Sequence, residues 1–204
     1  MILSMDASLV PFSWCLYGSQ GVIAADTLSL KHYENLPHDL QHIFKEQGII
    51  PQDIERIAII KGPGNYTGLR ASLALVRTWH LLFGTPVVCK NRLETMLYHV
   101  CKTESNEVTI AQAVRMNEYF ILQGKQSSQS FEITQPLTKI RGEDWAQHVK
   151  TQKVFGDSPQ DPVQDDVQWT NLAPVLAEWA QYSTPETSLE TISPLYTRAA
   201  VQAK

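Results

Sequence analysis

The chain has 204 residues, of which 43% are hydrophobic and 19% are charged, and its formal net charge at pH 7 is -4. This length allows one domain or two small ones with a sizeable core, and the composition excludes an intrinsically disordered chain. No apolar run approaches the roughly 18 residues of a membrane span. Because the charge is negative and the basic residues are scattered, the chain alone is not expected to grip a nucleic-acid backbone.

The first residues and the cysteines indicate the compartment. No basic segment precedes an apolar one at the N-terminus, so we expect a strand there instead of a signal peptide, and a protein of the cytoplasm. Cys15, Cys89 and Cys101 are odd in number and lack the spacing of metal ligands. We therefore expect buried, reduced thiols and no zinc site.

The first half of the chain alternates strands and helices. The apolar pattern and the turn residues predict strands at 2–8, 13–17 and 22–30, a helix at 36–47, a strand at 57–60, an apolar helix at 71–83, a strand at 87–89 and a helix at 93–101. Short turns separate the first three strands, which are therefore expected to be antiparallel. The predicted order is β-β-β-α-β-α-β-α.

A polar stretch at 102–107 predicts a domain boundary, with an N-terminal lobe at 1–104 and a smaller C-terminal α/β lobe at 105–204. The second lobe is predicted to contain strands at 108–114, 119–124, 130–134 and 153–155, and helices at 143–149 and 171–182. Residues 157–166, with two prolines and four aspartates, are expected to form a solvated loop.

A glycine-rich turn at 61–70 joins the strand at 57–60 to the apolar helix. Such a turn at a helix N-terminus first suggests a phosphate cradle. The spacing fails both phosphate templates, because Thr67 stands where a P-loop needs its second glycine, and Gly68 comes one residue too late after Gly62 and Gly64 for a dinucleotide fingerprint. The favoured alternative is a tight turn with Thr67 as the helix N-cap.

Asp6 and Ser8 end the first predicted strand, where a carboxylate and a hydroxyl could meet a phosphate or its Mg²⁺. Aspartate at such a junction is equally a turn former, and no lysine supports the catalytic interpretation. The turn is the favoured interpretation.

His38 and His42 are spaced i, i+4 on the first predicted helix, so they could share a metal if His32 or Glu34 supplied a third ligand. The favoured alternative is two exposed polar residues opposite an apolar stripe. His80 lies on the apolar helix, where a histidine of the core or of an interface is expected.

The helix at 71–83 is apolar round much of its circumference, so it must be covered on more than one side. The sheet can cover only one of those sides. A protein partner is one candidate for the other side, and another part of the same chain is the alternative.

Several segments together resemble the bacterial TsaB (YeaZ) family. They are Asp6-Ala7-Ser8, His32-Tyr33-Glu34, the turn from Gly62 to Arg70, Gly84-Thr85-Pro86-Val87-Val88 and Pro194-Leu195-Tyr196-Thr197-Arg198. The resemblance is strong to about residue 100 and thin beyond it. It implies a two-lobed α/β fold of the actin/Hsp70-like ATPase class. It also implies a role in making threonylcarbamoyladenosine at position 37 of tRNAs that read codons beginning with A.

Members of this family are taken to be non-catalytic partners of the related transferase subunit TsaD, with TsaE, an ATPase, joining the complex. In the transferase relatives the strand after the second helix leads into Asn-His-Leu-Glu-Gly-His, whose two histidines bind the metal. Here the run is Asn91-Arg92-Leu93-Glu94-Thr95-Met96, with neither histidine. Ala113-Val114-Arg115 likewise replaces the Asp-Ala-Arg that is common in TsaB relatives.

The resemblance therefore implies a scaffold subunit that has no cofactor of its own and meets tRNA only through the complex. A residual site for weak ATP or ADP binding would use Asp6, Ser8, Gly62 and Gly64. The alternatives are a kinase or ATPase of the same fold with a nucleotide between the lobes, and an α/β interaction module unrelated to tRNA.

The predicted contact with the TsaD-like subunit uses the first two helices, which could also pair two copies of this chain in isolation. The residues predicted for it are Leu36, Leu40, Ile43, Phe44, Leu69, Leu73, Val76 and His80. On this basis Leu73→Glu is expected to dissociate both assemblies.

Overall fold

The chain folds as two compact units. Unit 1 comprises residues 1–92 together with the chain from residue 170 onward, and unit 2 comprises Leu93–Trp169. The computed structural model describes residues 1–29, 33–128, 130–149, 152–157, 159 and 169–195. The predicted division at 104/105 is thereby corrected, because the chain leaves unit 1 earlier and returns to it at Thr170.

Unit 1 is built on one mixed sheet of five strands. They are β1 (Ile2–Asp6), β2 (Phe12–Gly18), β3 (Gly21–Leu28), β4 (Arg56–Ile60) and β5 (Val87–Lys90), in the order β3-β2-β1-β4-β5. The first three strands pair antiparallel through short turns, as predicted, whereas β4 and β5 pair parallel to β1 and to each other. Parallel pairing requires crossover helices, which the chain supplies between these strands.

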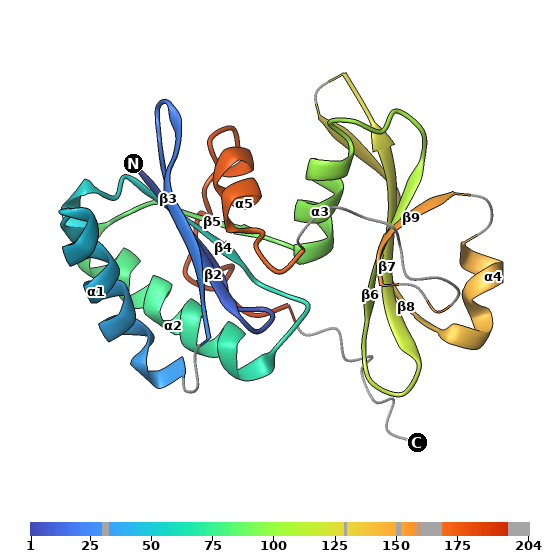
Figure 1. Cartoon of the computed structure of the whole chain (residues 1–204), viewed down its shortest axis with the longest axis horizontal. Helices are drawn as coiled ribbons and strands as arrows, with labels where there is room; N and C mark the ends of the chain where they lie inside the picture. The colour runs from blue at the N-terminus through green and yellow to red at the C-terminus, as the bar shows by residue number, and fades with distance from the viewer. Residues whose placement is uncertain (30–32, 129, 150–151, 158, 160–168, 196–204) are drawn as a thin grey trace. The chain divides into compact units, whose positions relative to one another are not determined.

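Helices cover both faces of this sheet. Figure 1 shows α1 (Leu36–Gln47) and α2 (Tyr66–Phe83) on one side and α5 (Ala173–Ala180) on the other. The alternation within β4 divides its residues between the two cores, since Ile57 and Ile59 pack with α1 and α2 while Ala58 and Ile60 pack with α5. A strand buried on both faces has an uninterrupted apolar sequence, which explains the run at 57–60.

The position of α5 is the physical reason for the corrected boundary. Its buried residues, among them Leu176 and Ala177, pack on β1, β2 and β4, and the hydroxyl of Ser4 on β1 donates a hydrogen bond of 2.6 Å to the carbonyl of Ala173. Without this helix one face of the unit 1 sheet would expose its apolar residues. Residues 170–195 therefore complete the first core instead of forming part of a second lobe.

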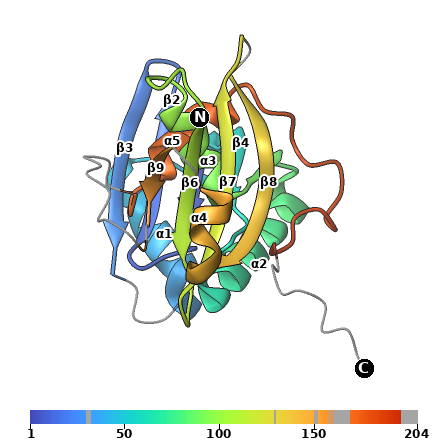
Figure 2. The same ribbon diagram turned by 90° about the vertical axis from the view of Figure 1, so that its right-hand side faces the viewer.

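Unit 2 contains a smaller sheet in the order β8-β7-β6-β9. Its strands are β6 (Val108–Ala113), β7 (Glu118–Gln126), β8 (Phe131–Arg141) and β9 (Lys153–Gly156). The short helix α4 (Trp145–His148) lies over one face, as Figure 2 shows, where Trp145 packs with Ala111 and Ile121. The helix α3 (Arg92–Val100) brings Leu97 so close to β7 that a Cβ on Gly124 would lie 2.5 Å from its Cδ2.

The predicted order of elements is confirmed through the first eight, and the main differences are in their bounds. Helix α2 begins at Tyr66, ahead of the predicted start at 71, and β8 continues to Arg141 beyond the predicted end at 134. Most of the predicted loop at 157–166 lies outside the described residues. Within the described part of the chain, no helix combines the length and the apolar character that crossing a bilayer requires.

Candidate functional site

The glycine turn is shaped by its contact with the end of β1. Asn65, and not the predicted Thr67, is the N-cap of α2, and its side-chain oxygen accepts hydrogen bonds from the N–H groups of Thr67 at 3.0 Å and Gly68 at 3.2 Å. The N–H of Asn65 donates to the carbonyl of Ser8 at 2.6 Å. Asn65 therefore fixes both the start of the helix and the position of the turn on β1.

Two of the glycines are required by close backbone approach. A Cβ on Gly64 would lie 2.2 Å from the carbonyl oxygen of Ser8, and one on Gly68 would lie 2.3 Å from that of Ala7. Gly62 has a left-handed φ of 125° and contacts Leu195 instead of the end of β1. The turn is thus glycine-rich because it lies directly on neighbouring backbone.

Asp6 lies at the centre of a buried polar cluster next to this turn. Its Oδ1 accepts hydrogen bonds from the N–H of Ser8 at 2.8 Å and from its hydroxyl at 2.5 Å. Its Oδ2 forms an ion pair of 2.5 Å with Nη1 of Arg92, which also donates to the Ser8 hydroxyl at 3.2 Å. Arg92 is in turn held by its own N–H, which donates to the carbonyl of Gly62 at 2.8 Å.

This cluster does not fit the Mg²⁺-bound phosphate that an actin-like ATPase fold implies. Asp6 is the carboxylate that would approach the metal, but it already faces a guanidinium, and a second cation beside Arg92 would be repelled. Gly64 packs against Ser8, and the N–H of Asn65 next to it donates to the carbonyl of Ser8. The structure brings Asp6, Ser8 and Gly64 together, as predicted. Arg92 and Ser8 occupy the positions around the Asp6 carboxylate that a metal or phosphate would need.

The residues chosen for the partner contact are corrected by the structure. Seven of the eight lie in the core of unit 1 with at most 5% of their surface exposed: Leu36, Leu40, Ile43, Phe44, Leu69, Leu73 and Val76. His80 is half-buried, and its Nδ1 forms a hydrogen bond of 2.8 Å with the carbonyl of Thr85. The seven apolar side chains pack in the core of unit 1, and of the eight residues only Leu40 and Phe44 also line a groove on the outer side of the two helices.

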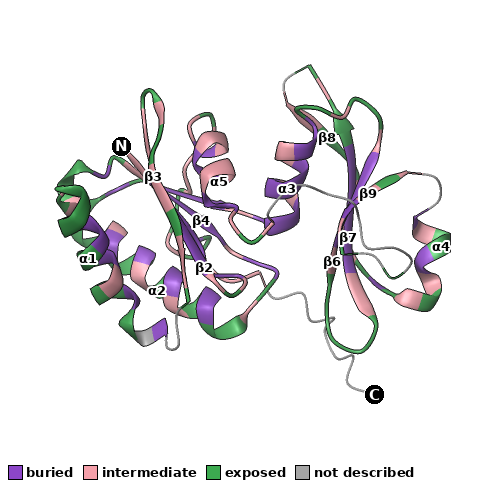
Figure 3. Cartoon of the chain, viewed as in Figure 1, coloured by how far each residue is buried: buried purple, intermediate pink, exposed green. Residues whose placement is uncertain are grey.

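A different set of side chains faces outward from the same helices. On α2 the exposed residues include Arg70, Arg77 and three apolar residues at its end, namely Leu81 (68% exposed), Leu82 (71%) and Phe83 (44%). Figure 3 shows the division between the buried side of both helices and the exposed side. Because α2 is apolar on both sides, its sequence could not indicate which side the sheet covers.

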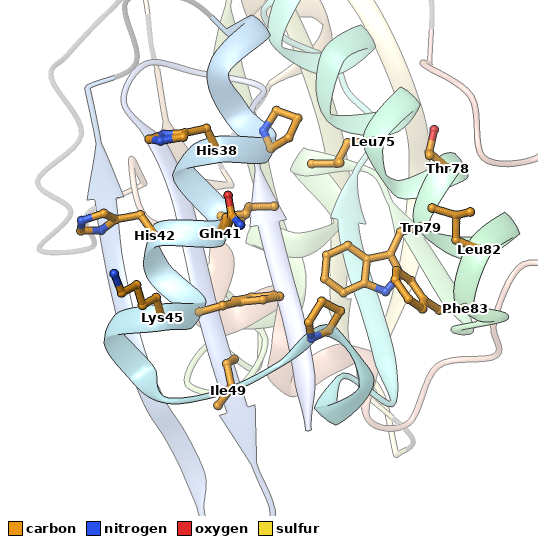
Figure 4. Close-up of a pocket in the computed structure, with 14 residues that line it drawn as sticks. His38, Gln41, His42, Lys45, Ile49, Leu75, Thr78, Trp79, Leu82 and Phe83 are labelled. Atoms are coloured by element: carbon orange, nitrogen blue, oxygen red, sulfur yellow. The ribbon is translucent and has the colours of Figure 1, made fainter.

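A groove of about 740 Å³ runs between α1 and α2 on this outer side. The residues that line it include His38, Gln41, His42 and Lys45 from α1 and Leu75, Thr78, Trp79, Leu82 and Phe83 from α2. In Figure 4 Leu75 and Trp79 point toward α1, whereas His38, His42 and Lys45 point away from α2. The ring of Trp79 makes edge contacts with Phe44 and Phe83, each with 5.6 Å between ring centroids. None of the fourteen residues that line the groove is an aspartate or a glutamate.

The predicted alternatives to a metal site fit the described residues. His38 and His42 are exposed, and Nδ1 of His42 lies 3.4 Å from a carboxylate oxygen of Glu46. His32 and the side chain of Glu34 lie outside the described residues, and no three His, Cys, Asp or Glu side chains within the described ranges are grouped to hold a metal ion. The three cysteines are free and buried, as predicted.

The two mixed sheets with their helices form the predicted α/β architecture of two lobes. A sequence model of the family described as "TsaD: tRNA N6-adenosine threonylcarbamoyltransferase" matches residues 18–155, so the chain belongs to that family.

Individual relatives agree with this assignment. The tRNA threonylcarbamoyladenosine biosynthesis protein TsaB of Bacillus subtilis (strain 168) is 30% identical over 97 residues, which are 47% of this chain and 42% of that protein. The aligned part thus spans less than half of that relative.

Two solved structures from Pseudomonas aeruginosa share the fold. One, of an uncharacterized protein with similarity to peptidase YEAZ, superposes with a TM-score of 0.74 at 19% identity, covering 97% of this chain and 99% of the other. The second, YeaZ, gives a TM-score of 0.69 at 17% identity, covering 96% and 98%. The predicted resemblance to the TsaB (YeaZ) family is confirmed.

Proposed function

We propose that this chain is a non-catalytic scaffold subunit required for N6-threonylcarbamoyladenosine formation at position 37 of tRNAs that read codons beginning with A. The observation that carries the proposal is the position of Arg92. It stands where the transferase relatives have their first metal-binding histidine, and its guanidinium is engaged by Asp6. Met96 stands at the second histidine position, is buried, and lies against Gly156. At these two positions the chain has an ion pair and an apolar contact, where the transferase relatives have metal ligands.

In this proposal the chain acts by forming a heterodimer with a TsaD-like transferase subunit through the outer face of α1 and α2. The exposed Leu81, Leu82 and Phe83 support this choice, because large apolar side chains gathered on a surface are typical of a protein contact. A TsaE-like ATPase would join the complex, and tRNA would meet this chain only through it. The same face could pair two copies when the transferase is absent. The site of action would be the cytoplasm.

The proposal is tested by reconstitution. The transferase subunit, the TsaE-like ATPase and unmodified tRNA are combined with and without this chain, and the modified nucleoside is quantified by mass spectrometry. We expect the nucleoside only when the chain is present, and we expect the chain to copurify with the transferase subunit. Equal amounts of nucleoside in both reactions would contradict the scaffold role.

A second measurement separates the scaffold from an enzyme of the same fold. The isolated chain is incubated with ATP, and its Asp6→Asn variant serves as the matched control. We expect no turnover by either protein. Turnover by the natural chain that the variant lacks, with the fold intact, would instead indicate an ATPase or kinase.

A further inference from the structure

The turn between β6 and β7 presents a group of exposed side chains at one end of unit 2. We define the β6–β7 tip as Val114, Arg115, Met116 and Asn117. Met116 is 94% exposed, Val114 is 38% exposed, and Arg115 and Asn117 are exposed as well. In Figures 1 and 2 the turn that joins β6 to β7 lies beyond the end of α4. The tip is therefore a surface of unit 2 that α4 does not cover.

The backbone of the tip is unfavourable for the methionine at its centre. Met116 and Asn117 have φ values of 59° and 58°, in the left-handed region. Turns of this kind favour asparagine and glycine, because the Cβ of other residues is strained there. Since the Met116 side chain is almost fully exposed, packing within the chain does not offset the strain. A side chain that is both strained and unpacked in its own chain points to a contact with another molecule.

The tip is nevertheless held in one position by its ends. The N–H of Val114 donates to the carbonyl of Glu118 at 2.7 Å. The N–H of Gly142 donates to the carbonyl of Asn117, also at 2.7 Å. A Cβ on Gly142 would lie 2.3 Å from Oδ1 of Asn117, so the Asn117 side chain lies directly on the backbone that follows β8. A partner would therefore meet an ordered loop, and little conformational entropy would be lost on binding.

Arg115 brings a positive charge to the tip. The other lysines and arginines that the structure describes in unit 2 each pair with a glutamate or lie over a tyrosine ring: Lys125, Lys139, Arg141, Lys153 and Lys102. Arg115 has no such partner among the described residues. Of the carboxylates that flank the tip, Glu118 lies 2.6 Å from Lys139, and Asp157 accepts a hydrogen bond of 2.7 Å from the N–H of Ala113. The Arg115 guanidinium is therefore available to a carboxylate of another protein.

We propose that the β6–β7 tip is a second protein contact of this chain, in which Met116 enters an apolar pocket of the partner and Arg115 pairs with a carboxylate beside that pocket. The inference rests on the proposed function and adds a contact in unit 2 to the one proposed for α1 and α2. Methionine is unbranched and polarizable, so it fits pockets of varied shape, and both methionine and arginine are enriched in protein interfaces.

A nucleic acid would also attract Arg115, but the rest of the tip argues against it. Binding to a phosphate backbone normally takes a cluster of cations, whereas the tip has one, and the chain has a formal net charge of -4. Met116 and Val114 would remain in contact with water and charge on such a backbone, whereas an apolar protein pocket would bury them.

Oxidation of the natural chain by dilute hydrogen peroxide tests the contact without any substitution. Peroxide transfers an oxygen atom to an exposed methionine and gives the sulfoxide and water, and mass spectrometry of peptides measures the rate for each methionine. Met5 and Met96 are 0% and 2% exposed, so they serve as internal standards that should stay reduced. We expect the rate at Met116 to fall at least about tenfold when the chain is assembled with the transferase subunit and the TsaE-like ATPase.

Four variants separate the parts of the contact. Met116→Gly removes the side chain and the backbone strain, and Met116→Leu keeps the apolar bulk. Arg115→Glu reverses the charge of the tip, and Lys125→Glu, its matched control, makes the same change near the other end of β7. Each variant is titrated into the reconstituted reaction, and the chain concentration that gives half of the maximal amount of nucleoside is measured.

We expect Met116→Gly and Arg115→Glu to raise this concentration at least about tenfold, Met116→Leu to raise it less, and Lys125→Glu to leave it unchanged. The melting temperature of Met116→Gly should not fall, because glycine adopts a positive φ without strain. A lower melting temperature with an unchanged half-maximal concentration would make Met116 a structural residue and overturn the inference.

The remaining outcomes distinguish this inference from the proposed function. If the complex forms and modifies tRNA while Met116 is oxidised as fast as in the isolated chain, the inference fails and the proposed function stands. If no complex forms, both fail. Protection of Met116 by tRNA alone would assign the tip to nucleic acid, and protection that grows with the concentration of the isolated chain would assign it to a second copy. Either result would overturn the inference.

Discussion

The guanidinium of Arg92 lies 2.5 Å from the carboxylate of Asp6, and the two side chains are 2% and 3% exposed. The residues are far apart in the chain, at the end of β1 and at the start of α3. A charge buried this deeply is tolerated only when an opposite charge and hydrogen bonds compensate it, and Ser8 supplies hydrogen bonds to both side chains. Because the N–H of Arg92 also donates to the carbonyl of Gly62, the pair fixes the end of β1, the glycine turn and the start of α3 at one point.

Breaking this pair on one side should destabilise the chain strongly. We expect Arg92→Met to lower the free energy of unfolding of unit 1 by about 3–5 kcal/mol, because Asp6 would be left buried without its partner. The double variant Asp6→Asn with Arg92→Met should be less destabilised than Arg92→Met alone, since it contains no unpaired charge. Urea denaturation of the natural chain, the variants Asp6→Asn and Arg92→Met, and the double variant measures this, and additive effects of the two substitutions would contradict the coupling.

Replacement by alanine should lower the free energy of unfolding by different amounts at two glycines of unit 1, Gly68 and Gly48. Gly68 is helical, so helix propensity alone would favour alanine there by about 1 kcal/mol, but a Cβ would lie 2.3 Å from the carbonyl oxygen of Ala7. Gly48 has a left-handed φ of 64° with nothing within 4 Å of a Cβ, so alanine there costs only about 1–2 kcal/mol of backbone strain.

We therefore expect Gly68→Ala to be the more destabilising substitution, with a loss of about 3 kcal/mol. Thermal unfolding of both variants under one set of conditions measures the difference. The reverse ranking would show that the contact between α2 and the end of β1 can relax.

The order of strands and helices could be predicted because it depends on local patterns. The uninterrupted apolar residues at 57–60, the proline near the start of α1 and the glycine after it are all visible in the sequence. The return of the chain to unit 1 could not be predicted, because the apolar α5 would suit either sheet. Its docking depends on which sheet has an uncovered face, which is a tertiary property.

The candidate site was predictable to a similar degree. The nearness of Asp6 to the glycine turn follows from the parallel pairing of β1 with β4. The ion pair of Arg92 with Asp6 could not be predicted in this way, because the position of Arg92 in the sequence indicates only that a histidine is absent there. The choice of interface residues failed for a different reason. Hydrophobic periodicity identifies the stripe of Leu69, Leu73 and Val76 on α2, but it does not tell whether the sheet or a partner covers that stripe, and in the structure the stripe packs in the core of unit 1.

The corrected interface changes the expected effect of Leu73→Glu. Leu73 is 2% exposed in the core, so a glutamate there should unfold unit 1 instead of dissociating a folded complex. Leu82 is 71% exposed, so Leu82→Glu should leave the unfolding temperature nearly unchanged and weaken binding to the transferase subunit. Circular dichroism and copurification of the two variants separate these effects, and a folded Leu73→Glu protein would contradict the assignment to the core.

The buried thiols should make the chain less stable in alkaline solution. Burial raises the pKa of Cys15 from its ordinary value of about 9 to about 11, and it raises the pKa of Cys89 to about 12. Above pH 9 the unfolded chain releases these protons while the folded chain retains them, so the unfolded state binds fewer protons and the free energy of unfolding falls as the pH rises. For Cys15 the fall should extend from about pH 9 to about pH 11.

The variant Cys15→Ala lacks one of these groups, and its free energy of unfolding should therefore fall less steeply over that interval, whatever its value at pH 7. Burial also raises the pKa of Tyr33, so the comparison of slopes between the natural chain and the variant is the informative measurement. Urea denaturation at several pH values between about 8 and 11 provides these slopes. Equal slopes in both proteins would show that Cys15 titrates alike in the folded and unfolded states, which would contradict its burial beneath α5.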